Sequence, residues 1–183
     1  SIVNRSLSAP PVIVNVAGQR RLLNDRGIGL AHFFIFWTFV FYATSFGWNL
    51  VRGLIPALPI PYSDEAAWFA LPMEILTFVA VVAIVGAALR RYVFTPEGLS
   101  RTWDATLILI LISILLVTFL IGQGAKAVAE DVAWSPAGTL FGALLSGLGV
   151  EDGSGLYQWM WWLHMATVLG FMGYLPFSKH LHL

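Results

Sequence analysis

The sequence predicts an all-α membrane protein: a bundle of four transmembrane helices, with a short interfacial helix between the third and fourth spans. Three observations support this prediction. Of the 183 residues, 58% are hydrophobic and only 11% are charged, and the mean hydropathy is +0.78. Apolar runs of the ~20 residues that a helix needs to cross the hydrocarbon core of a bilayer recur along the chain.

The composition also excludes several classes of function. The ten basic and ten acidic residues cancel, so no basic surface is left over to bind nucleic acid. The chain contains no Cys, which excludes a disulfide framework, a thiolate nucleophile and any iron–sulfur cluster held by cysteines within this chain. Any redox centre in the chain must therefore use other ligands.

Two regions are expected along the chain. Residues 1–27 are expected to form a cytoplasmic or interfacial segment, because residues 10–26 mix apolar and basic side chains as segments at lipid headgroups do. A disordered lead-in is the alternative. Residues 28–183 are expected to form one membrane domain, because a chain of this length has no room for a large catalytic domain as well.

Within this domain, four apolar runs are expected to cross the membrane as helices. They cover residues 28–51, 66–89, 103–123 and 156–177. Between the third and fourth runs, Ser135 and Pro136 have the pattern of a helix N-terminus, and an apolar run continues to Leu148. Because that run is too short to cross, it is expected to be an interfacial or re-entrant helix.

The basic residues predict the orientation of the spans. Eight of the ten fall on one side of the predicted membrane: Arg5, Arg20, Arg21, Arg26, Arg90, Arg91, Arg101 and Lys179. Only Arg52 and Lys126 fall on the other side. Basic residues are in excess in cytoplasmic loops, so both termini are expected to face the cytoplasm, with the chain an integral protein of a prokaryotic cytoplasmic membrane.

The placement of the four histidines is the most informative feature of the sequence. His32 lies about one turn inside the cytoplasmic end of the first span, and His182 lies just past the cytoplasmic end of the fourth. Two imidazoles at similar depth can bind both axial positions of a haem iron, which makes a b-type haem the natural candidate where thiolates are absent. From spacing alone, ligation and a hydrogen-bonded interfacial role are equally open.

Cationic side chains near that depth suit the anionic haem propionates. They are Arg20, Arg21, Arg26, Arg101 and Lys179. His164 precedes His182 by eighteen residues, which is five complete turns of a regular helix, and it lies near the opposite surface. A polar ring in an apolar run is by default a functional candidate, so a second haem is possible there. His180 is expected to be a hydrogen-bonded interfacial residue.

The histidine-bearing stretches resemble a known family. The run from His164 to Phe171, continuing through Pro176, Phe177 and Ser178 to His182, resembles the last span of the respiratory nitrate reductase gamma-chain family, in which both histidines are haem ligands. Residues 20–37 are similar to the N-terminal membrane domain of iron–sulfur oxidoreductases related to heterodisulfide reductase, where a b-type domain is fused to a cytoplasmic iron–sulfur part.

The resemblance implies quinone chemistry coupled to haem b, with electrons exchanged with a cytoplasmic iron–sulfur partner. The chain departs from the pattern at two positions: Tyr42 stands where the gamma chains have a second histidine, and Thr38 stands where a Gly is common in the fused proteins. The alignment also implies that one preceding span of the gamma chain is missing. His164 therefore has no partner at Tyr42 for a second haem.

Two residues of the second span are candidates to act with His164. Met73 is a possible haem ligand, although a core-filling role is more common for Met. Glu74 is an intramembrane carboxylate, and with His164 it is a candidate quinone site that carries protons; a plain polar pair that stabilises the bundle is the alternative.

The expected function is that of a membrane cytochrome b domain, the quinone-linked electron-transfer subunit of an oxidoreductase complex. It would hold haem b through His32 and His182, and exchange electrons between a quinone pool and a cytoplasmic iron–sulfur partner. The alternative is a haem-free membrane anchor for a soluble oxidoreductase. A transporter or channel subunit is the weakest alternative, because apart from Glu74 the spans carry almost no charge.

Overall fold

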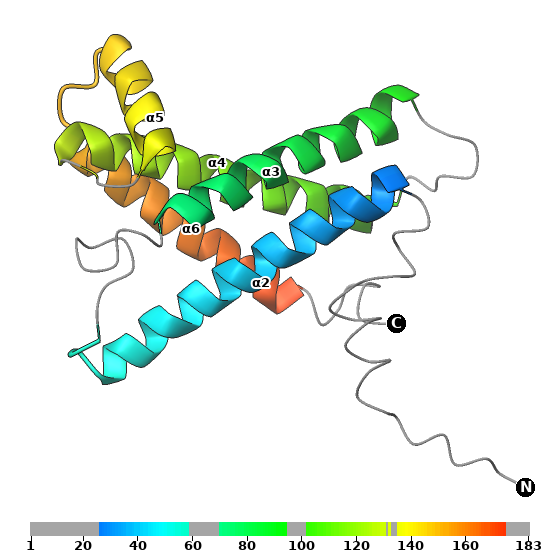
Figure 1. Ribbon diagram of the computed structural model, residues 1–183, viewed down its shortest axis with the longest axis horizontal. Coiled ribbons are helices and arrows are strands. Elements are labelled where there is room, and N and C mark those ends of the chain that lie inside the picture. The colour runs from blue at the N-terminus through cyan, green and yellow to red at the C-terminus, as the bar shows by residue number, and fades with distance from the viewer. Residues whose placement is uncertain (1–25, 59–69, 95–101, 131, 133–134, 175–183) are drawn as a thin grey trace, which may run out of the picture.

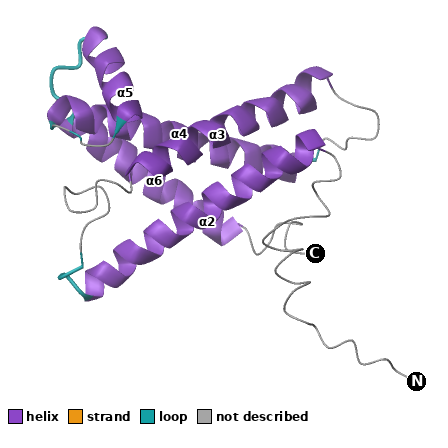
Figure 2. Cartoon of the chain, viewed as in Figure 1, coloured by secondary structure: helices purple, strands orange, loops and turns teal. Residues whose placement is uncertain are grey.

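The computed structural model describes residues 26–58, 70–94, 102–130, 132 and 135–174. Throughout these ranges the regular structure is helical, as the sequence predicts (Figure 2). The helices are α2 (Arg26–Leu54), α3 (Ala70–Leu89) with the π-helical turn η4 (Arg90–Phe94), α4 (Trp103–Ala129), α5 (Pro136–Gly147) and α6 (Ser154–Tyr174). A helix therefore forms in each predicted span, and α5 begins at the proline that predicts it.

Three helical stretches are long and apolar enough to cross a membrane, which supports an integral membrane protein. They are Gly29–Leu54, Leu71–Phe94 and Trp103–Ala129. They correspond to the first three predicted spans, and the third runs about six residues further than predicted, to Ala129 rather than residue 123. The helix in the fourth predicted span, α6, is not among them, because its tryptophans, Gln158 and His164 lower its hydropathy.

The helices are arranged in two packed groups (Figure 1). Helix α4 packs along both α5 and α6, α2 packs along α3, and smaller contacts of α3 with α4 and α5 join the groups. Successive long helices run in opposite directions in Figure 1. At one end of the bundle, Tyr92 in η4 donates a hydrogen bond to Thr106 Oγ1 of α4 at 2.8 Å, and Tyr174 at the end of α6 donates to Asp104.

Helices α2 and α3 are joined by hydroxyl groups. Thr38 Oγ1 donates to the carbonyl oxygen of Leu76 at 3.3 Å. The Tyr42 hydroxyl lies 2.6 Å from Thr77 Oγ1, which in turn lies 2.7 Å from the carbonyl oxygen of Met73. Because Thr77 uses its single proton on that carbonyl, Tyr42 is the donor to Thr77. Tyr42 stands where the gamma-chain family that the sequence resembles has a histidine. In this structure it helps to hold α2 against α3.

Small residues let α4 approach its neighbours closely. A Cβ placed on Gly124 of α4 would lie 2.6 Å from the Cβ of Phe141 in α5, and one placed on Gly142 would lie 3.1 Å from the Cβ of Ala127. A Cβ at Gly153, just before α6, would collide with the backbone of Ala125. Helices in membranes associate largely through such close contacts between backbones.

Apolar side chains cover much of the outside of the bundle. Leu54 is 85% exposed and Val82 is 72% exposed, whereas several hydroxyl-bearing residues between the helices are buried. Extended exposed apolar surface marks a protein that contacts a membrane or a partner. The distribution agrees with a bundle surrounded by lipid.

Candidate functional site

His164 is held by α4. The residue lies in the middle of α6 and is partly buried, and its Nδ1 atom lies 2.9 Å from Thr118 Oγ1. Thr118 itself is 3% exposed, and its hydroxyl also lies 2.7 Å from the carbonyl oxygen of Ile114. The imidazole ring is therefore oriented by a contact between two helices, 46 residues apart in sequence.

Glu74 is held by the N-terminus of α5. Its side chain is 1% exposed. The backbone amide of Ala137 donates to Oε2 at 2.7 Å, the amide of Gly138 donates to Oε1 at 3.3 Å, and the Ser135 hydroxyl also donates to Oε1. A helix N-terminus presents unpaired amides and a partial positive charge, so it stabilises a carboxylate in a buried place. These hydrogen bonds hold the N-terminus of α5 against α3.

The sequence-predicted pair of Glu74 and His164 has separate partners in the structure. The hydrogen bonds of Glu74 lead to α5, and the hydrogen bond of His164 leads to α4. Met73, the neighbour of Glu74, is 1% exposed, which fits a residue that fills space between helices.

Sequence reasoning did not identify Thr118 or the role of Ser135. Both carry hydroxyl groups in or beside apolar runs, and that is the one signal that marks them. The sequence predicts Ser135 as part of a helix N-terminus. Nothing in the neighbouring residues indicates that this N-terminus binds the carboxylate of Glu74, 61 residues earlier.

The remaining predicted ligands are mostly outside the described residues. His32 lies near the start of α2 with its side chain exposed. Arg20, Arg21, Lys179, His180 and His182 fall outside the described residues. In the described ranges, groups of three or more His, Asp or Glu side chains suited to a metal ion do not occur, but a haem with two axial imidazoles requires no such group. Ligation by His32 and His182 stays a prediction.

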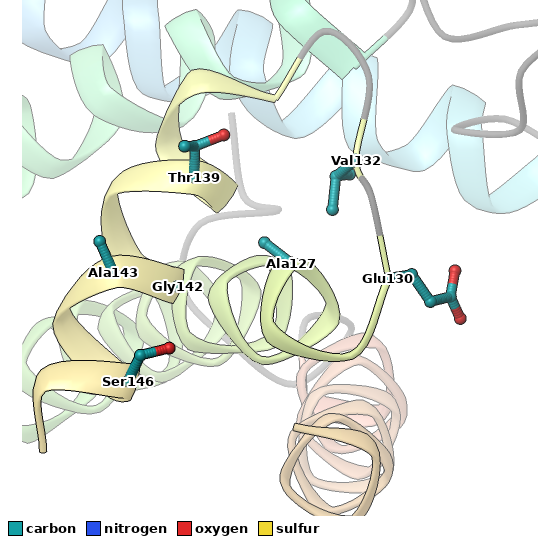
Figure 3. A pocket seen from close by; sticks show the side chains of 7 residues that line it. All are labelled: Ala127, Glu130, Val132, Thr139, Gly142, Ala143 and Ser146. Atoms are coloured by element: carbon teal, nitrogen blue, oxygen red, sulfur yellow. The ribbon is translucent and has the colours of Figure 1, made fainter. Parts of the chain in front are cut away.

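An open cleft of about 330 Å³ lies between the end of α4 and α5. Its lining residues are Ala127, Glu130, Val132, Thr139, Gly142, Ala143 and Ser146. Figure 3 shows the α5 side chains along one wall, Ala127 opposite, and the Glu130 carboxylate turned away from the cleft. The lining includes neither Glu74 nor His164, so the cleft is separate from both polar contacts.

In the described part of the chain, the fold and these contacts define a class: a helical membrane protein whose interior polar groups join its helices. Comparison with known proteins relates the chain to oxidoreductases. It is 34% identical over 176 residues to the probable iron–sulfur-binding oxidoreductase FadF of Bacillus subtilis, a match that covers 93% of this chain and 24% of the relative. It is 26% identical over 179 residues to the EtfAB:quinone oxidoreductase of Syntrophomonas wolfei subsp. wolfei, covering 90% of this chain and 25% of that protein.

The chain thus spans about a quarter of the length of the curated relatives it matches. No family model and no solved structure matches the chain.

Proposed function

We propose that this chain is a membrane cytochrome b domain that transfers electrons between a quinone pool and a cytoplasmic iron–sulfur oxidoreductase partner. The observation that carries the proposal is the similarity of nearly the whole chain to parts of two oxidoreductases, one described as iron–sulfur-binding and the other as acting with quinone.

The composition indicates which cofactors this chain can hold and which must be held by its partner. Because the chain has no Cys, an iron–sulfur cluster held by cysteines must lie elsewhere. The helices of this chain have the length and apolar surface to lie in the bilayer, where a quinone dissolves. A haem in this chain that links the two would use ligands other than Cys, and histidine is the residue that supplies them in this proposal.

The proposed topology has four crossings, with α6 as the fourth. Helix α6 has 21 residues, which gives it a length of ~32 Å, enough to cross the hydrocarbon core. Its tryptophans, Trp159, Trp161 and Trp162, suit the membrane interface. Four crossings return the C-terminus to the side of the N-terminus, which the excess of basic residues assigns to the cytoplasm.

In this proposal His32 and His182 would hold a haem b on the cytoplasmic side, and Arg20, Arg21 and Lys179 would pair with its propionates. His164, at the middle of α6, would be a ligand of a second haem. The donor chemistry fits, because imidazole nitrogens are axial ligands of b-type haem and the ring of His164 is already oriented by Thr118. When bound, haem supplies a one-electron carrier that connects two-electron quinone chemistry to one-electron partners.

The proposed quinone site lies at the end of the bundle where Glu74 meets α5. In it, Glu74 positions α5, and His164, which is held by α4, is the second predicted member of the site. A direct proton-carrying role for Glu74 would compete with the three hydrogen bonds that hold its carboxylate, two at Oε1 and one at Oε2.

The rival function is a haem-free anchor for a soluble oxidoreductase. The contact between His164 and Thr118 is compatible with this anchor, because a histidine with a purely structural role makes the same kind of bond between helices.

A reduced-minus-oxidised optical spectrum of the purified chain separates the two functions. We expect the alpha band of a b-type cytochrome, and a flat difference spectrum would leave the anchor.

A further inference from the structure

Helices α4 and α6 run antiparallel in one register along their whole length. Asp104 meets Tyr174 at one end, and Ala125 meets Gly153 at the other. Between them, Thr118 meets His164. One turn further along α4, a Cβ on Gly122 would lie 3.6 Å from the Cβ of Met160, one turn back along α6. Contacts on both sides therefore fix the position of the Thr118 hydroxyl relative to the imidazole.

The contacts of this hydroxyl determine which atom donates. Thr118 Oγ1 lies 2.7 Å from the carbonyl oxygen of Ile114, 3.1 Å from that of Leu115 and 2.9 Å from His164 Nδ1. Carbonyl oxygens accept hydrogen bonds and never donate, and a hydroxyl has one proton. Because Thr118 directs that proton to the carbonyls of its own helix, His164 Nδ1 must carry the hydrogen of the bond between the helices.

The tautomer of His164 follows from this assignment. A neutral imidazole has one protonated and one unprotonated nitrogen, so protonation at Nδ1 leaves a lone pair on Nε2. Nε2 lies on the other side of the ring from Nδ1. The lone pair of His164 therefore points away from Thr118.

We propose that Thr118 is a positioning residue that holds His164 in the tautomer whose unprotonated Nε2 would bind haem iron. This inference rests on the proposed function, and it adds the residue that orients the ligand. Histidines that bind metals almost always donate their other ring N–H to a fixed acceptor, which sets the ring orientation and makes the ligating nitrogen more basic. The Thr118 hydroxyl, nearly buried and fixed by the register of α4 and α6, meets that requirement.

The test compares hydroxyl-bearing and hydroxyl-free side chains at position 118 in the complete protein. In Thr118→Val, which has nearly the same shape, we expect haem content to be kept and the midpoint potential of one haem to rise, because a less basic ligand stabilises oxidised iron less. In Thr118→Ser, which keeps the hydroxyl, we expect the potential of the wild type. Potentiometric titration followed at the alpha band measures both.

Ser113 offers a matched control on the same helix. Its hydroxyl donates to the carbonyl oxygen of Leu109 at 2.7 Å, the same kind of bond that Thr118 makes to Ile114. This bond lies within α4, so Ser113→Ala removes an intrahelical hydroxyl bond and spares the contact with His164. We expect this variant to keep the potential of the wild type.

The outcomes separate this inference from the proposed function. If His164→Ala loses a haem while Thr118→Val keeps the wild-type potential, the role of Thr118 is refuted and the ligand role of His164 stands. If His164→Ala keeps its full haem content, the ligand role of His164 and the positioning role of Thr118 are both refuted. Should Thr118→Val not accumulate, Thr118→Ala is the second hydroxyl-free variant, and an unchanged potential in it overturns the inference equally.

Discussion

The Glu74 carboxylate of α3 accepts a hydrogen bond of 2.7 Å from the backbone amide of Ala137, in the first turn of α5. The contact joins two residues 63 positions apart, and it attaches a helix too short to cross a bilayer to one that is long enough. The amide of Gly138 and the hydroxyl of Ser135 complete the set of donors. A buried carboxylate thus takes the place of a local N-terminal capping residue for α5.

Removing this carboxylate should destabilise the protein. In Glu74→Ala, the three donors lose their acceptor in a buried place, and each unsatisfied donor costs about 1–3 kcal/mol. We expect lower thermal stability in detergent and faster proteolysis near α5. Glu74→Gln keeps an acceptor oxygen, so its stability should lie between that of Glu74→Ala and that of the wild type. Thermal unfolding and limited proteolysis measure the two effects. An alanine variant with wild-type stability would show that α5 is held by other contacts.

Close packing between α4 and α5 should make Gly124 intolerant of larger residues. A Cβ there would lie 2.6 Å from the Cβ of Phe141, so Gly124→Ala forces the helices apart, with an expected cost of about 1–3 kcal/mol. Gly86 of α3 has open space around the corresponding position, so Gly86→Ala is the matched control and should be tolerated. Equal thermal stability of the two variants would contradict the packing seen here.

The cytoplasmic-side haem should depend on His32. In His32→Ala we expect loss of one haem per chain with helical content kept, because the side chain is exposed on α2. His180→Ala should keep normal haem content. Haem extraction with circular dichroism measures both, and an unchanged haem content in His32→Ala would refute this ligand assignment.

The start of α6 should lose stability in acid. The pKa of the Asp152 carboxyl is lowered because it accepts a hydrogen bond from the backbone N–H of Ser154, and a second from its hydroxyl. A carboxyl whose pKa is lower in the folded state stabilises the fold above its unfolded pKa of ~3.9, and that stabilisation is lost as the pH falls below it.

In Asp152→Asn this contribution is absent at every pH. The difference in melting temperature between wild type and variant should therefore be small but measurable at pH 7, and should shrink as the pH falls below ~3.9. A difference that stays constant with pH would exclude the carboxylate as its source.

The sequence predicts the helices well and their contacts poorly, for a physical reason. Hydropathy and proline mark where helices such as α4 and α5 begin, because crossing a bilayer and starting a helix are local requirements. The contact of Glu74 with Ala137 and that of Thr118 with His164 depend on the register between helices, which glycines such as Gly124 and Gly153 set by allowing close approach. Nothing in a single helical run encodes that register.

The fourth predicted span shows that hydropathy alone does not decide whether a helix crosses the membrane. Helix α6 forms where it is predicted, but its tryptophans give it a composition that length and hydropathy alone do not identify as a membrane span. A crossing by α6 therefore stays part of the proposal, and its length and antiparallel packing on α4 are compatible with it.

Haem content per chain tests the central claim most directly. A pyridine haemochrome assay on the purified protein, normalised to protein concentration, should give at least one haem b for each chain. A colourless preparation, made with haem available during expression, would contradict the account and leave an anchor whose histidines serve packing alone.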